Sequence, residues 1–355
     1  MNAAWSEKNK EMQKLLSRKD TFTAGKAALL ELRADIFEQL TSIVNTCPAE
    51  AFYAQPYLNA KGYHSKTLAY SLWHIFRIED IVAHTLILGD EQVLFSGDHL
   101  VKTGSPLVTT GNELRGGQIA DFSRQLDAKA VLEYSKAVML STNALIDTLT
   151  FPDLKKRFTD ADKARLTASG CVSEDEQAAW LIEYWCGKDV LGLIRMPFSR
   201  HWIMHAEAML RIRDRLCVLA RKGVDQTAYC GFSCVHCFLG AWCGSCRTAY
   251  NTCSFATCFK DRQCPNVTCC REKGLDGCWE CPELLACAKG FYSLGAEGNA
   301  PKSQALFIAK YGKEEFFRVH DNLHKKYNFK KIQEIMDTDI DKGLRFLEEN
   351  RQERP

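Results

Sequence analysis

Apolar residues recur every three or four positions through most of the first 220 residues, which is the period of an amphipathic helix. Four such stripes are separated by polar or glycine-rich stretches. Ser65 is the expected N-cap of the second stripe, and Gly89 is its expected end. The pattern predicts a four-helix bundle whose long helices cover residues 29–47, 65–89, 127–149 and 199–219.

The connections between these helices carry further predictions. The glycine-rich stretch 90–126 is too long for a tight hairpin and predicts a crossover along the bundle. An inserted helix is expected between the third and fourth long helices, from a capping box at Ser173 and Glu176 to Gly187. We expect its Trp180 and Trp185 to pack against the bundle.

Cysteine usage changes sharply along the chain. Of the 17 cysteines, 13 lie between Cys230 and Cys287, which places a domain boundary near Gly223. After them, helical patterning returns, with one helix around residues 304–323 and a further helix carrying Ile332 to Leu347. The sequence therefore predicts a mainly α protein with a bundle at 1–222, a small cysteine-rich metal-binding module at 223–299, and C-terminal helices at 300–355 that pack on this module.

Charge and targeting features narrow the class of protein. The formal net charge is +2, and residues 223–299 contain six Lys or Arg against seven Asp or Glu, which disfavours nucleic-acid binding. The first ten residues lack the apolar run of a signal peptide, and no apolar stretch is long enough to span a membrane. We expect a cytoplasmic protein, and the sequence allows a homodimer. In a reducing compartment, dense cysteines indicate metal ligands rather than disulfides.

Histidines mark a candidate site in the bundle. His201 and His205 are four residues apart, and so their rings leave the predicted fourth helix on one face. His74 lies on the inward face of the second helix. His84 is rotated away from that face, and we expect it to be structural or exposed. Glu207 also points elsewhere, and we expect it at most to contact a ligand histidine without binding the metal. Three inward histidines can hold Zn, Fe or Ni with open coordination positions. The alternative is that each is a hydrogen-bonded core residue.

Residues 72–80 (LWHIFRIED) and 198–205 (FSRHWIMH) resemble the DinB-like, or YfiT-like, metal-dependent four-helix-bundle family, and the likeness extends over about residues 20–220. The resemblance implies one ligand histidine in the second helix and an HxxxH pair in the fourth. It also implies a metal-dependent enzyme, a thiol-dependent transferase or a hydrolase, acting on a small-molecule or thiol substrate. The catalytic domain that accompanies related bundles in sulfoxide synthases is missing, and the inserted helix around Trp180 departs from the family pattern.

The cysteine spacings are typical of metal ligands. Pairs separated by two residues let two sulfurs hold one ion, and two pairs complete a tetrahedron. We expect zinc, with an iron–sulfur cluster as the alternative, and His236 could replace one thiolate. Residues 226–320 also resemble an uncharacterised cysteine-rich family, which implies metal binding and no particular chemistry. A non-catalytic zinc or iron–sulfur protein, redox-sensing and with the bundle as scaffold, is therefore the alternative function. The predicted ligands of this module are Cys230, Cys234, Cys237, Cys243, Cys246, Cys253, Cys258, Cys264, Cys269, Cys270, Cys278, Cys281 and Cys287.

Overall fold

The computed structural model describes residues 2–57, 60, 62–237, 243–250, 256, 259 and 263–352. These residues contain no β-strand, only two isolated β-bridges, and so the prediction of a mainly α protein is confirmed. Contacts divide the chain into two units, Met1–Arg213 and Asp214–Pro355. The division falls within α10 (His201–Ala220), ahead of Gly223, and the cysteine-rich residues share one unit with the C-terminal helices.

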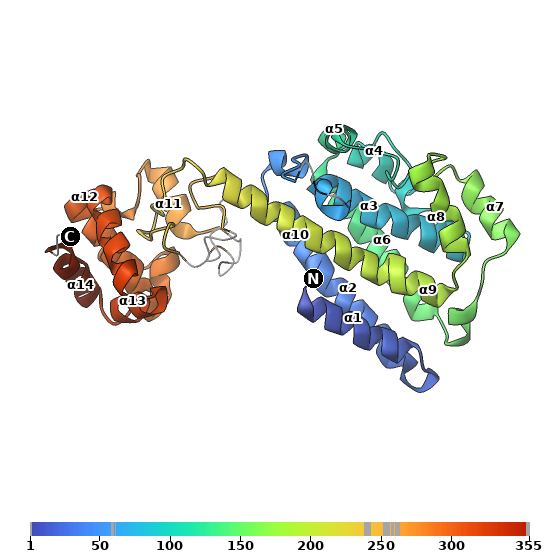
Figure 1. The fold of residues 1–355 in the computed structure, drawn as a ribbon, viewed down its shortest axis with the longest axis horizontal. Coiled ribbons are helices and arrows are strands. Elements are labelled where there is room, and N and C mark those ends of the chain that lie inside the picture. Colours follow the sequence, from blue (N-terminus) through green and yellow to red (C-terminus); the bar gives the residue numbers. More distant parts are fainter. Residues whose placement is uncertain are drawn as a thin grey trace. The chain divides into compact units, whose positions relative to one another are not determined.

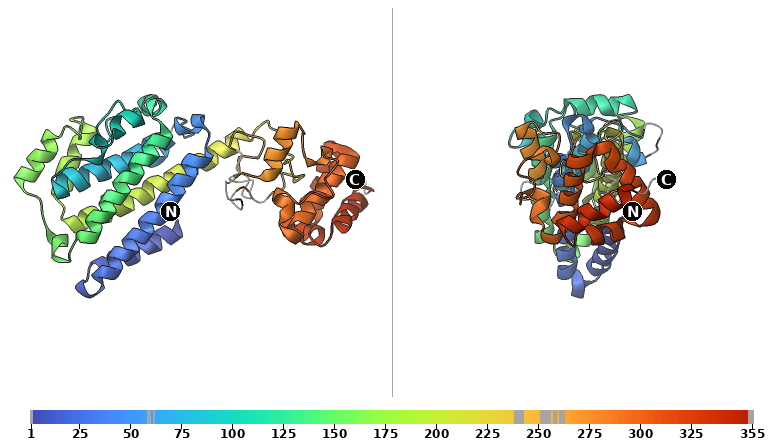
Figure 2. Two further views of the ribbon diagram at one scale, coloured as in Figure 1. Left: turned by 180° about the vertical axis from the view of Figure 1, so that it is seen from behind. Right: turned by 90° about the vertical axis from the view of Figure 1, so that its left-hand side faces the viewer.

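The first unit is built on the four predicted long helices. They are α2 (Phe22–Thr46), α3 (Leu68–Asp80), α6 (Ala128–Thr148) and α10, and they lie side by side in Figures 1 and 2. Helix α6 begins after Asp127, near the predicted start, and the Asp127 side chain caps it by accepting from the backbone N–H groups of residues 129 and 130. The N-cap of α3 is Thr67, not Ser65, because the Thr67 hydroxyl accepts from the N–H of Tyr70 while Ser65 ends a separate 3₁₀ turn. A π-helical segment, Ile81–Leu88, continues α3 to Gly89, whose φ of 73° ends it.

Helix α1 (Ala3–Leu16) was not predicted from the sequence. It packs along α2 and buries Trp5, Met12 and Leu16, a stripe too sparse to signal a helix. Gly25 permits the close approach, since a Cβ there would lie 2.7 Å from the backbone nitrogen of Leu16. The two helices therefore form an antiparallel hairpin at the edge of the bundle (Figure 1).

The connections contain short helices. The crossover carries α4 (His99–Thr103) and α5 (Gly117–Gln125), and the later insertion carries α7 (Asp160–Ala168), α8 (Glu176–Cys186) and α9 (Val190–Arg195). The capping box predicted at Ser173 is wrong: Asp175 caps α8, and the described capping box is Thr159 with Asp162 on α7. Of the two tryptophans on α8, Trp185 is buried at 1% exposure, but Trp180 is 50% exposed, and so its predicted packing is wrong.

The second unit contains α11 (Pro265–Lys273), α12 (Asn299–Lys326), α13 (Phe329–Met336) and α14 (Ile340–Gln352). The single helix predicted from Ile332 to Leu347 is two helices, because Asp339 interrupts it and accepts from the N–H groups of residues 341 and 342. Helix α14 packs on α12, with Phe316 and Leu347 in their shared core.

A second core surrounds the cysteines. Cys230, Cys264, Cys270 and Cys278 are buried with Phe291, and Ala305 of α12 packs against them. Because few large aliphatic side chains contribute, this core is small. The predicted contact between the C-terminal helices and the cysteine-rich residues is therefore present within this unit.

Candidate metal centres

His74 is oriented by the crossover. It lies in the middle of α3 at 5% exposure, and its Nδ1 is 2.6 Å from the carbonyl oxygen of Thr110. A carbonyl can only accept, so Nδ1 carries the proton and Nε2 keeps a lone pair. A histidine held in this way presents a defined nitrogen to a metal ion.

His201 and His205 begin α10 and face His74. The ring centroids are 5.1 Å apart for His74 and His201, 4.8 Å for His74 and His205, and 4.6 Å for His201 and His205. One ring nitrogen from each residue lies within 4.8 Å of the other two. The structure thus brings together the three histidines that helical phase predicted.

These rings have unsatisfied polar atoms. Nδ1 of His201 and both ring nitrogens of His205 are buried and have no hydrogen-bond partner in the described part of the chain. A buried polar group without a partner costs about 1–3 kcal/mol. The alternative of hydrogen-bonded core histidines therefore holds for His74 but not for His205, and a shared metal ion would accept the lone pair of one nitrogen from each ring.

Burial also sets the charge of the site. It lowers the pKa of His74 to about 4, and it lowers the pKa values of His201 and His205 well below 6.5. All three imidazoles are consequently neutral at pH 7. Neutral imidazole is the form that binds a metal.

Two other residues considered in the sequence lie outside this group. His84 is buried, with Nδ1 2.7 Å from Asp90 and Nε2 3.0 Å from the Ser141 hydroxyl, so its role is structural as expected. Glu207 is not part of the histidine group, and it accepts a hydrogen bond from the backbone N–H of Asn2.

Polar and aromatic residues that were not predicted from the sequence border the three histidines. The Tyr63 ring contacts the His205 ring edge-on at 4.6 Å, and Tyr70 stacks on His74 at 5.3 Å. Lys66 is half-buried with its Nζ 4.9 Å from the Tyr70 ring centroid, and burial lowers its pKa. Its positive charge acts on both His74 and His205. These residues lie before and at the start of α3, where no hydrophobic period marks them.

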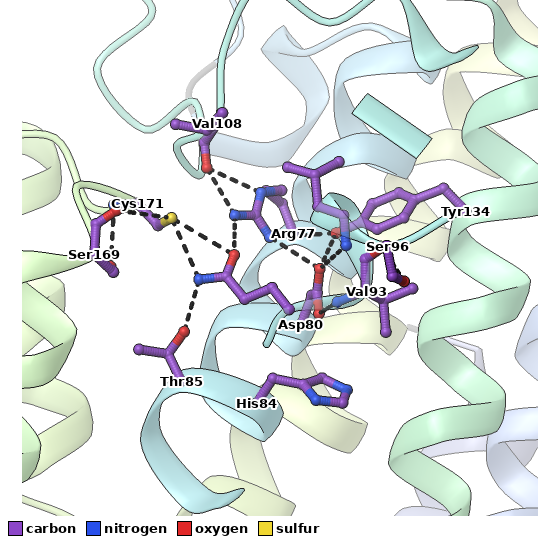
Figure 3. Close-up of polar contacts among 12 residues, drawn as sticks. Arg77, Asp80, His84, Thr85, Val93, Ser96, Val108, Tyr134, Ser169 and Cys171 are labelled. Carbon is purple, nitrogen blue, oxygen red and sulfur yellow. Dashed lines mark hydrogen bonds and ion pairs between the residues drawn. The ribbon is translucent and has the colours of Figure 1, made fainter. Parts of the chain in front are cut away.

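A buried network holds the crossover that reaches His74. Figure 3 shows Arg77, Asp80 and Tyr134 pointing toward one another. Arg77 donates to the Val108 carbonyl at 2.8 Å and to Asp80 at 3.1 Å, and Tyr134 donates to Asp80 at 2.7 Å. Asp80 also accepts from the N–H of Val93 at 2.8 Å. Both the start of the crossover and the residues beside Thr110 are thereby fixed to α3.

A second buried network links the helices that carry His74, His201 and His205. Arg33 of α2 forms a bidentate pair with Glu79 of α3, at 2.7 and 2.9 Å. The Trp202 indole donates to the same carboxylate at 2.8 Å, and Arg33 also donates to the Phe198 carbonyl at 3.0 Å. The turn before α10 and its first residues are therefore anchored next to α3.

Most of the predicted cysteine ligands fall into two neighbourhoods. Cys234, Cys237, Cys243 and Cys246 act on one another electrostatically. In the second neighbourhood Cys270 interacts with Cys230, Cys269 and Cys278, and Cys264 interacts with Cys278. Cys281 and Cys287 join Cys269, Cys270 and Cys278 around a small cavity. Cys253 and Cys258 lie outside the described residues.

The first neighbourhood contains the four thiols that one tetrahedral ion needs, but no three of their sulfurs lie within 4.8 Å of one another. Among the described residues, three or more ligand atoms lie within 4.8 Å of one another only in two groups of histidines. Burial raises the pKa of Cys234 to about 12 and that of Cys246 to about 11, so both are neutral thiols at pH 7 without a cation. Coordination would deprotonate them. The cysteine ligands therefore stay a prediction.

His236, which was considered as a replacement for a thiolate, lies instead in the second histidine group with His320 and His324 of α12. His320 and His324 were not predicted as ligands, although they repeat the four-residue spacing of His201 and His205. That spacing could have identified them.

No described helix has the length and apolar character needed to cross a membrane. No model of a known protein family matches the chain, and no curated protein is significantly similar to it.

Proposed function

We propose that this protein is a metal-dependent enzyme of the DinB-like type, a thiol-dependent transferase or a hydrolase, that uses a metal held by His74, His201 and His205. The observation that carries the proposal is the convergence of three neutral, buried imidazoles, of which His205 has no hydrogen-bond partner on either nitrogen. Their nitrogen donors fit Zn, Fe or Ni.

A metal with three protein ligands keeps positions for water or substrate, and when bound it would act as a Lewis acid and lower the pKa of a water or thiol. The protein supplies orientation. Thr110 fixes the tautomer of His74, and the Arg33–Glu79 pair holds α3 near the start of α10. Lys66 has no carboxylate partner among the residues that the structure describes, and it offers a cation to an anionic group such as a thiolate or carboxylate of the substrate.

The first test is the metal content of the full-length chain and of its His201→Ala/His205→Ala variant, with His99→Ala as the matched control. His99 is half-buried and lies outside both histidine groups. We expect the double variant to lose one equivalent of metal and the control to lose none. Equal metal in the folded double variant and the wild type would exclude the bundle site.

The second test is turnover per folded molecule against a panel of thiols and electrophiles. His74→Ala should abolish turnover with helical content unchanged, while Cys278→Ala/Cys281→Ala should lower the amount of folded protein more than the rate. A cysteine variant that folds, keeps its bundle metal and is inactive would move the chemistry to the second unit.

One observation favours the second candidate, a non-catalytic zinc, iron–sulfur or redox-sensing protein. The Sγ atoms of Cys270 and Cys278 are 3.7 Å apart in the buried cysteine core. Protein purified without oxygen would then carry its metal mainly on thiolates and would show sulfur-to-metal charge transfer. Loss of that absorption on mild oxidation, with no turnover against any substrate, would support this candidate over the enzyme.

A further inference from the structure

His320 is a buried histidine with nothing to bind. It lies on α12 at 3% exposure, and neither ring nitrogen has a hydrogen-bond partner among the residues that the structure describes. Its ring packs against Phe316 at 4.4 Å, in the core that α12 shares with α14. Leaving both nitrogens desolvated is costly, and so the position calls for a ligand that accepts a lone pair.

Two more histidines converge on it. His324 follows one turn later on α12, and His236 comes from the cysteine-rich segment. The His236 ring lies 5.7 Å from that of His320 and 4.4 Å from that of His324, and one nitrogen from each of the three is within 4.8 Å of the others. Nitrogens bound to one tetrahedral zinc ion are roughly 3.3 Å apart. The rings of His236 and His324 are stacked at an interplanar angle of 11°, so coordination requires one of them to turn out of the stack as the nitrogens move closer.

His236 already has the partners of an oriented ligand. One ring nitrogen, Nε2, is 2.9 Å from the Asp321 carboxylate, and the other, Nδ1, is 2.8 Å from the Ser233 hydroxyl. A carboxylate that accepts from the second ring nitrogen fixes the tautomer of a metal-bound histidine. With Nε2–H donating to Asp321, the Nδ1 lone pair can leave the Ser233 hydroxyl for a cation.

Charge also suits a cation. Burial lowers the pKa of His320 to about 3, and the pKa of His324 is lowered as well, so these rings are neutral at pH 7. Asp321 supplies a negative charge beside them. Of the nine histidines in the chain, six lie in the two groups of three, which makes chance clustering a poor explanation for either.

We propose that His236, His320 and His324 bind one divalent transition-metal ion of the zinc type, at a site distinct from the bundle histidines. The bound ion joins the segment between Cys234 and Cys237 to α12. It therefore fixes one edge of the cysteine-rich core to the helix that supports it. The proposal does not depend on the enzymatic function of the bundle.

The test uses the full-length protein loaded with zinc and freed of excess metal. His324 is partly exposed, so His324→Gln should fold normally, and it should lose one equivalent of tightly bound zinc. His320→Gln/His324→Gln should lose the same equivalent and no more, and His99→Gln should lose none. Asp321→Asn should keep the site but weaken it by roughly 10–100-fold in competition with a chromophoric zinc indicator.

Cobalt(II) substitution identifies the donors. The difference spectrum between wild type and His324→Gln should show d–d bands without sulfur-to-cobalt charge transfer. Unchanged zinc in folded His324→Gln would overturn the proposal, and so would a difference spectrum with a thiolate band. If the double variant fails to fold by circular dichroism, the single variant still decides.

Discussion

At the scale of single residues, burial without a partner is the most informative property of this protein. His205 and His320 lie on different helices, and each is buried with neither ring nitrogen hydrogen-bonded to any described residue. Neither could be distinguished from an ordinary core histidine by its place in a hydrophobic stripe. A ligand histidine differs from a core histidine in whether neighbouring atoms hydrogen-bond to its ring, and many of those atoms belong to segments distant in the sequence.

Acid should weaken the metal-depleted protein through these residues. The pKa of His74 is about 4 in the folded protein against about 6.5 when unfolded, so the unfolded chain binds more protons between these values. The contribution of His74 to the free energy of unfolding is therefore fully present above about pH 6.5. It is lost as the pH falls toward 4, by on the order of 3 kcal/mol for His74 alone. Urea unfolding at several pH values measures this loss. His74→Ala should flatten the dependence, and an equally steep profile in that variant would contradict the assignment.

The two tryptophans of α8 form a matched pair. Trp185→Ala should cost about 3–5 kcal/mol because it empties a fully buried position, whereas Trp180→Ala should cost less than about 1 kcal/mol. Thermal or urea unfolding of both variants checks this. Similar losses in the two would mean that Trp180 is covered in solution.

At the scale of elements, the local sequence predicted helices wherever one face is continuously apolar. The long helices of the bundle, including the start of α6 near Asp127, were found in this way. Helix α1 was missed because its contact with α2 rests on only three buried side chains. Each histidine group combines two histidines on one helix with a third from another segment. Helical periodicity could place His74, the third histidine of the bundle group, because it lies on a helix. It could not place His236, which lies on a segment without regular secondary structure.

The buried Arg33–Glu79 pair should contribute more to the stability of the bundle than an exposed ion pair does. Arg33→Met should destabilise the protein by about 3–5 kcal/mol, since Glu79 is left as an uncompensated charge at 0% exposure. Arg33→Met/Glu79→Gln should recover part of the loss. Arg18→Met, which removes an exposed pair with Asp20, is the control and should cost less than about 1 kcal/mol. Strict additivity of the two buried changes in urea unfolding would argue against their coupling.

At the scale of the whole molecule, the two units differ in what stabilises them. The first has a large apolar core, and the second has a small core that mixes cysteines with a few aromatic and aliphatic side chains. Chelation should consequently expose residues 230–287 to protease while residues 2–213 stay protected. Mass spectrometry of the fragments gives the result. Unchanged protection after verified removal of metal would count against a structural role for the ions.

The hydrogen bond from His74 to Thr110 has an evolutionary consequence. The acceptor is a main-chain oxygen, which every residue type provides, so the identity of residue 110 is under little selection from this contact. What the contact requires is the path of the backbone. Arg77 and Asp80 hold this path through their bonds to Val108 and Val93, and Gln92 supports it by accepting a hydrogen bond from Arg77. Relatives that share the three histidines should therefore preserve these three side chains while position 110 drifts. Alanine scanning would detect the group that orients His74 only through the residues that hold the crossover.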